Sequence, residues 1–178
     1  MFTRYALSLV ALVAVTAPSA AQQFDNGNLY VGPRVWIGNL NGSAAIGGQI
    51  ERGFTAPGEV GPGIIGGGVG VDYYSWSQNL TLGDFNYSVV PFQLFGNYHF
   101  VIEKNRRIDP YLGLAFVYSM VSSSWDGTGI GAGASVAGNY TTFAGQGGVR
   151  YFMSDRVSLQ GQVGFGYGTL GMGATFKL

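Results

Sequence analysis

The sequence contains no cysteine and few charged residues. Of its 178 residues, 10% are Asp, Glu, Lys or Arg, and their formal charges cancel at pH 7. Without cysteine, the chain has neither a disulfide nor a cysteine-ligated metal site, whatever its compartment. A net charge of zero argues against nucleic acid as a partner, because binding to phosphates needs an excess of Lys and Arg. Aromatic residues make up 15% of the chain, which excludes a largely disordered protein.

The chain also lacks an apolar run of the ~20 residues that a membrane-spanning helix needs. Its N-terminal apolar stretch, residues 5–17, follows Arg4 and is followed by Ser19, Ala20 and Ala21. A basic start, a short apolar run and small residues predict a signal peptide over residues 1–21, cleaved after Ala21. A short N-terminal anchor helix is the alternative. Residues 22–178 then form a single exported domain.

Alternation with a period of two dominates the rest of the chain. In residues 157–178, apolar side chains such as Phe165 and Phe176 occupy one parity, while Ser, Gln, Gly, Thr and Lys occupy the other. This pattern predicts two strands joined at the Gly-rich turn 166–169. The same alternation predicts six earlier strands, at residues 29–38, 44–54, 64–76, 85–102, 111–121 and 139–152.

Turn residues separate these strands. Asn41-Gly42 is a strong hairpin signal, and polar loops are predicted at 77–84 and 122–138. Eight consecutive strands with no helical pattern between them favour a closed barrel that leaves no sheet edge exposed. Most runs reach the ~9–11 residues with which a tilted strand crosses a bilayer. The predicted fold is therefore all-β, an eight-stranded antiparallel up-and-down transmembrane β-barrel.

The polar parity of these strands carries few charges. A water-exposed outer wall would be richer in Lys and Glu, so we expect the polar parity to line the lumen. The apolar parity, flanked by Tyr and Trp, would then face lipid. A soluble periplasmic lipocalin-like binder, with the two faces reversed, is the alternative.

Four charged residues form the candidate functional cluster. Arg34, Glu51, Asp72 and Arg150 all fall on the inward parity. Because an unpaired charge inside a low-dielectric wall is costly, we expect Arg–carboxylate pairs. Such pairs either gate a narrow water path or plug the lumen. The interior of an eight-stranded barrel is barely wide enough for its own side chains, which favours the plug.

The sequence gives little support to catalysis. His99 is the single histidine and is predicted to point inward near the turn that follows Glu103, whereas Ser122, Ser123 and Ser124 lie far along the next strand. A Ser–His nucleophile pair is therefore not expected, and one histidine with scattered carboxylates makes no recognisable metal site. We expect a non-enzymatic protein with no cofactor, in which His99 is a hydrogen-bonded lumen or rim residue.

Three segments and the closing hairpin resemble the small eight-stranded outer-membrane barrel family, which includes the OmpA transmembrane domain and the OmpW-like proteins. The segments are residues 97–100, 109–114 and 147–156. The resemblance implies a bacterial outer-membrane protein with both termini in the periplasm and with loops 77–84 and 122–138 outside. It implies a structural, envelope or surface-contact role; the alternatives are a narrow channel or carrier for small or hydrophobic solutes and, less favoured, a lipid A-modifying enzyme.

The last strand resembles the C-terminal assembly signal of this family, carried here by Gly173, Phe176 and Leu178. Such a signal usually ends in an aromatic residue, so Leu178 departs from the pattern. The resemblance implies two partners, outer-membrane lipid and the barrel assembly machinery, which would bind the C-terminal strand. A small solute is a further candidate partner.

Overall fold

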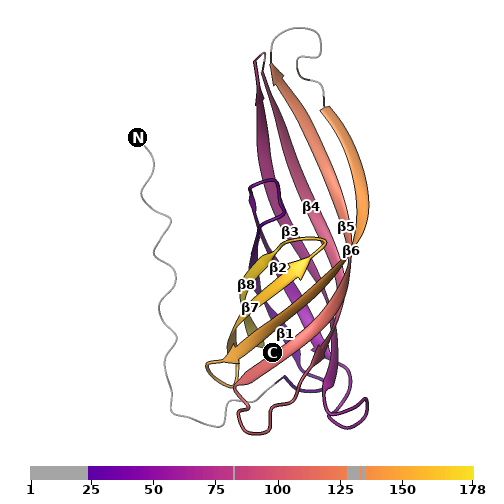
Figure 1. The fold of residues 1–178 in the computed structure, drawn as a ribbon, viewed down its shortest axis with the longest axis vertical. Helices are drawn as coiled ribbons and strands as arrows, with labels where there is room; N and C mark the ends of the chain where they lie inside the picture. Colours follow the sequence, from indigo (N-terminus) through magenta and orange to yellow (C-terminus); the bar gives the residue numbers. More distant parts are fainter. Residues whose placement is uncertain (1–23, 82, 128–132, 134) are drawn as a thin grey trace.

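The fold is a closed ring of eight antiparallel strands in a computed structural model that describes residues 24–81, 83–127, 133 and 135–178. Each strand pairs with its sequence neighbours and β8 pairs with β1, which confirms the up-and-down barrel (Figure 1). The predicted signal peptide, residues 1–21, lies outside the described residues. Within those residues no helix is long and apolar enough to cross a membrane. The strands are β1 (Leu29–Ile37), β2 (Ala44–Gly53), β3 (Ile64–Leu80), β4 (Gly83–His99), β5 (Ile108–Gly127), β6 (Ser135–Phe152), β7 (Val157–Phe165) and β8 (Leu170–Lys177).

The β1–β2 hairpin forms where the sequence predicts it. Asn39 and Asn41 adopt positive φ angles of 55° and 52°, and Gly42 follows at 81°. Asn and Gly are the residues that enter this left-handed region at least cost, so the chain reverses there without strain from a bulky Cβ.

Three of the four central strands, β3, β5 and β6, are longer than the alternation predicts, and β4 is shifted towards the tall end. β3, β4, β5 and β6 rise well above the other strands and form a tall sheet at one end of the barrel (Figure 1). Most of the predicted loops 77–84 and 122–138 is therefore strand: β3 runs to Leu80 and β4 starts at Gly83, while β5 runs to Gly127 and β6 starts at Ser135. We call the part of this sheet from Tyr74 upward the extension. It comprises residues 74–80, 83–89, 121–127 and 135–138.

Aromatic pairs explain why these polar stretches stay in the sheet. On the inward face of the extension, the Trp76 and Tyr87 rings stack at 4.8 Å between centroids, and the Phe85 and Trp125 rings lie 4.6 Å apart. These are cross-strand neighbours in the β3–β4 and β4–β5 registers. Such aromatic pairs stabilise the pairing of the two strands, and this gain outweighs the weak strand preference of the polar residues around them. Most of the Ser and Asn residues that suggested loops, such as Ser77, Asn86 and Ser122, lie on the opposite, outward face, whereas Ser123 faces inward beside Tyr87.

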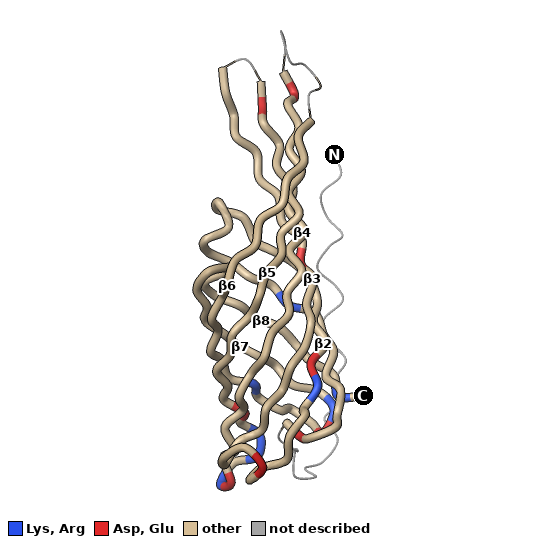
Figure 2. The backbone as a smooth tube through the Cα atoms, turned by 90° about the vertical axis from the view of Figure 1, so that its right-hand side faces the viewer, with Lys and Arg blue, Asp and Glu red and all other residues tan. Residues whose placement is uncertain are grey.

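The other end of the barrel, which we call the terminal end, has the turns that follow β2, β4 and β6 and both ends of the described chain. There β4 ends at His99 rather than at 102, and β5 begins at Ile108 rather than at 111. The charged turn between them is as predicted. Lys and Arg residues gather in this lower half of the molecule, whereas only acidic residues colour the tall end (Figure 2).

Around the barrel, the apolar parity faces outward and the polar parity faces inward. Outward side chains remain exposed even when large, for example Ile46, Leu114 and Met172 at 64%, 71% and 63%. Inward positions hold the buried Arg, Asp, Glu, Gln and His side chains. This arrangement is the reverse of a lipocalin-like binder, in which the apolar parity would line the cavity.

Candidate functional site

The lumen contains two networks of buried charged and polar side chains. The first, which we call the Glu51 network, joins four strands near the terminal end. Arg150 of β6 donates from Nη2 to Glu51 Oε2 of β2 at 2.6 Å, and its Nη1 lies 3.9 Å from Asp109 Oδ2 of β5. His99 of β4 lies between the same two carboxylates, and Asn97 donates to Glu51 Oε1 at 2.7 Å. All five side chains are buried, so the acids and bases neutralise one another without solvent.

His99 bridges the two carboxylates through both ring nitrogens. Its Nε2 lies 3.0 Å from Glu51 Oε1, and its Nδ1 lies 2.9 Å from Asp109 Oδ1. A neutral imidazole has a single N–H and donates to one of them, whereas an imidazolium donates to both. In the imidazolium form, two cations and two anions balance in the cluster, which is the arrangement that a dry interior tolerates best.

The second network, which we call the Arg34 network, lies on β1, β2, β3, β4 and β7. Arg34 forms a bidentate pair with Asp72, Nε to Oδ1 and Nη2 to Oδ2, both at 2.8 Å. Gln93 donates to Asp72 Oδ2 at 2.9 Å, and Gln49 accepts from Arg34 Nη1 at 3.2 Å. Gln49 in turn donates to Gln160 across the lumen at 3.1 Å. Bidentate Arg–carboxylate geometry with further amide hydrogen bonds makes this a rigid polar layer.

The predicted cluster of Arg34, Glu51, Asp72 and Arg150 is therefore inward and buried, with the expected Arg–carboxylate pairing. The pairs belong to two hydrogen-bonded networks rather than to one. Asp109 was not among the predicted cluster residues, because it precedes the strand predicted at 111–121, whereas β5 already begins at Ile108. The position of Asp109 two residues before the inward-facing Tyr111 could have indicated an inward side chain, because residues two apart on a strand point to the same face.

Phe24 closes the terminal end of the lumen. Its ring stacks on the His99 imidazole, with centroids 3.7 Å apart and planes 9° apart, and on the Tyr30 ring at 4.7 Å. The guanidinium carbon of Arg150 lies 5.4 Å from the Phe24 centroid. The side chain is fully buried, with Ile64 and Phe152 in the same cluster. Nothing in the alternation pattern marks it, because Phe24 precedes the first strand.

The segment that carries Phe24 is fixed to the barrel by polar contacts. The Asp25 amide donates to the Tyr30 hydroxyl at 3.1 Å, and the Asp25 carboxylate pairs with Lys177 of the last strand at 3.1 Å. The Gly27 amide donates to the Gly53 carbonyl at 2.9 Å. These contacts hold the entry segment across the mouth of the barrel.

An apolar cluster fills the lumen towards the extension. Trp36 and Tyr167 meet edge to face at 5.9 Å and pack with Leu40, Val89 and Phe95. From the terminal end upward, the lumen is thus occupied by Phe24 and its neighbours, the two polar networks, and this apolar cluster. An eight-stranded barrel is just wide enough for such filling.

The remaining predicted positions lie as follows. None of the hydrogen bonds of His99 joins a serine, and in the described part of the chain no group of three or more His, Asp or Glu side chains is arranged to hold a metal. In β8, Phe176 faces outward and pairs with Val31 and Val157, while Gly173 packs against the Pro33 carbonyl. The Leu178 amide donates to the Leu29 carbonyl at 2.9 Å.

Fold and lumen together define an eight-stranded antiparallel barrel of the outer-membrane type. The chain is similar to the N-terminal β-barrel domain of Pseudomonas aeruginosa OprF, with 13% identity, a TM-score of 0.55, and coverage of 86% of this chain and 98% of that one. It is also similar to Ail, the attachment invasion locus protein of Yersinia pestis, with 11% identity, a TM-score of 0.54, and coverage of 85% and 97%. No family model matches the sequence, and no curated protein does either.

Proposed function

We propose that this chain is a non-enzymatic bacterial outer-membrane protein with a filled lumen, which presents its extension for contact outside the cell. The proposal rests on one observation: along β3–β6, the outward face changes from apolar to polar. Around the barrel the outward face is apolar, whereas on the extension it holds Ser75, Ser77, Asn86 and Ser122. A surface that changes from apolar to hydroxyl-rich along one sheet fits a chain that leaves the hydrocarbon and enters water.

The extension supports a contact role through its free edges. Above the barrel, no described strand pairs with the outer edge of β3 or with that of β6. Such edges present N–H and C=O groups to which an extended partner segment adds as a further strand. The aromatic pairs on the inward face keep these edges in a fixed position, which lowers the entropic cost of binding.

The charge distribution argues against a polyanionic partner at the extension. Residues 73–102 and 108–149 contain no Lys or Arg. One of the similar structures is Ail in complex with the heparin analogue sucrose octasulfate, at 12% identity and a TM-score of 0.51. Because sulfate and phosphate recognition relies on cationic side chains, we do not extend that ligand to this chain.

The filled lumen favours a structural barrel over a channel for small solutes. Phe24 at one mouth and the Trp36 and Tyr167 cluster at the other enclose both polar networks. In planar bilayers we expect no conductance above that of the bare membrane, either for the wild type or for Arg150→Gln. A conductance that rises when Glu51 or Arg150 is neutralised would instead establish a gated channel.

Cell fractionation tests the proposal as a whole. The full-length chain would be expressed in a Gram-negative host, and the outer-membrane fraction run on a gel with and without boiling. We expect a band that sediments with the outer membrane and shifts on heating. A periplasmic band without a heat shift, recovered without detergent, would refute the proposal.

A further inference from the structure

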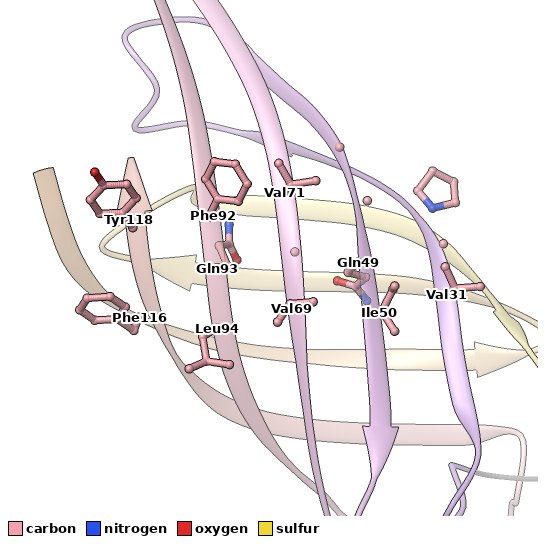
Figure 3. A pocket seen from close by; sticks show the side chains of 15 residues that line it. Val31, Gln49, Ile50, Val69, Val71, Phe92, Gln93, Leu94, Phe116 and Tyr118 are labelled. Atoms are coloured by element: carbon pink, nitrogen blue, oxygen red, sulfur yellow. The ribbon is translucent and has the colours of Figure 1, made fainter. Parts of the chain in front are cut away.

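The outer wall of the barrel has a hollow on its β1–β5 side, with a volume of about 880 Å³. Figure 3 shows its lining as two rows of side chains standing on neighbouring strands. The row nearer the terminal end consists of Val31, Ile50, Val69, Leu94 and Phe116, which are direct partners across successive strands. We call the hollow between the two rows the β1–β5 groove.

The second row explains why the wall is hollow here. Its members are Pro33, Gly48, Val71, Phe92 and Tyr118, again direct partners from strand to strand. Gly48 lacks a side chain and Pro33 is short, so the row is low on β1 and β2 and tall on β4 and β5. A Cβ added at Gly48 would meet one atom within 4 Å, the Gly32 carbonyl oxygen at 3.5 Å, so the space above it is open.

We propose that the β1–β5 groove binds one fatty acyl chain of a lipid in the outer leaflet. This inference depends on the proposed membrane location. The side chains that line the groove from the outward parity are apolar, and the Gln49 and Gln93 side chains turn away into the lumen networks. Among the outward-facing side chains only Tyr118, at one end of the second row, carries a polar group, its hydroxyl, so hydrocarbon is the matching occupant of the groove.

The dimensions of the groove suit an acyl chain. Five strands spaced about 4.8 Å apart give each row a length of about 19 Å. Because strands in such barrels tilt by about 40°, a chain lying along the rows would cover about 12 Å of membrane depth. One leaflet supplies about 15 Å of hydrocarbon, half of a core about 30 Å thick. On β3 and β4, Val71 and Phe92 lie three residues below Tyr74 and Val89, where the extension begins, so this part of the groove lies on the outer-leaflet side.

A second copy of the chain fits the groove less well. The most exposed aromatic side chains on the other side of the barrel are Phe143 and Phe165, at 78% and 70%. Inserting them into the groove of a neighbour would join unlike faces, and such contacts build open rows instead of closed dimers. Two grooves facing each other would leave a void, which dispersion contacts disfavour.

Photo-crosslinking tests the proposal. The full chain would be refolded into phospholipid vesicles that contain a lipid with a diazirine near the end of its acyl chain, and labelled peptides would be mapped by mass spectrometry. Gly48→Leu fills the groove. Gly161→Leu is the matched control, because Gly161 is exposed on β7 and a Cβ there meets nothing within 4 Å.

We expect label on the β1–β5 rows to exceed that on the outward positions of β6–β8 several-fold, and Gly48→Leu, but not Gly161→Leu, to remove the excess. Even labelling around an inserted barrel, or an excess that survives Gly48→Leu, would overturn the acyl-chain site alone. Protection of the β1–β5 rows from label, with even labelling of the rest of the wall, would replace lipid with a second copy as the occupant. A chain that neither floats with vesicles nor shifts on heating would overturn the proposed function, and the acyl-chain site with it.

Discussion

Phe24 and His99 stack face to face, with ring centroids 3.7 Å apart, although Phe24 precedes the first strand and His99 ends the fourth. The stack covers an imidazole that contacts two buried carboxylates, Glu51 and Asp109. Phe24 thus separates the charged network from water at the terminal mouth. Gly66 makes room for it, since a Cβ there would lie 2.9 Å from Phe24 Cζ.

Truncating this ring should destabilise the barrel. We expect Phe24→Ala to lower the free energy of unfolding by about 3 kcal/mol, the usual cost of removing a fully buried aromatic side chain. The reason is both the cavity and the water that would reach the Glu51 network. Urea titration of the barrel in vesicles, followed by tryptophan fluorescence, measures it. Phe54→Ala is the control, because Phe54 is 60% exposed on the outer wall; an equal loss in both variants would contradict the stopper role.

The Glu51 network should respond more strongly to removal of one charge than to removal of a pair. Arg150→Met leaves Glu51 and Asp109 buried without their guanidinium, so we expect a loss of about 3–5 kcal/mol. The double variant Glu51→Gln/Arg150→Met should recover part of this loss in the same urea titration. The half-buried pair Lys177–Asp25 near the barrel rim is the comparison, and Lys177→Met should cost about 1 kcal/mol, less than Arg150→Met. If the losses of stability caused by Glu51→Gln and by Arg150→Met simply add up in the double variant, the two residues do not act together.

Two adjacent glycines on β2 should tolerate alanine very differently. A Cβ at Gly47 would point into the lumen and collide with the Val71 carbonyl and the Asp72 carboxylate, which holds Arg34. We expect Gly47→Ala to cost about 3 kcal/mol through overpacking. Gly48→Ala points outward into open space and should change stability by no more than about 0.5 kcal/mol. Heat-shift temperatures on gels would rank the two variants, and similar values would show that the inward and outward assignments are wrong.

The aromatic pairs should hold the extension without supporting the barrel. Trp76→Ala removes the ring stacked on Tyr87, so we expect the extension to open and to be cleaved several-fold faster by an added protease. The heat shift of the barrel should change little, since Trp76 lies above the closed ring and only partly covers the apolar cluster, at Tyr74. Ser75→Ala, on the neighbouring outward position, is the control and should leave the cleavage rate unaltered. Loss of the heat shift in Trp76→Ala would instead make the pair part of the barrel core.

Much of this architecture follows from the sequence alone. Alternation with a period of two is a local property, and it correctly assigned Arg34 and Asp72 to the lumen and Phe92 and Leu114 to the outer wall. Eight consecutive strands then required a closed ring, because an open sheet would expose its edges. The sequence therefore determined the strand order, the hairpin at Asn41-Gly42 and the two faces of the wall.

The tertiary structure decided which inward residues meet. Glu51 and Arg150 are 99 residues apart, and Arg34 and Asp72 are 38 apart, so the height of each on the wall depends on the register of every strand pair between them. Parity gives the face of a residue but not its height, which is why four charges that share a face divide into two networks. The same reason hid the meeting of His99 with Phe24 and with Asp109.

The length of the extension likewise depends on tertiary contacts. Serine-rich stretches such as 122–124 predict loops when read locally, because their composition resembles that of a turn. Cross-strand contacts such as Phe85 with Trp125 keep them in strands, and such contacts join residues 40 positions apart that no local window compares. Local alternation thus sets the two faces of each strand, whereas strand register and cross-strand packing set where a strand ends and which side chains meet inside the barrel.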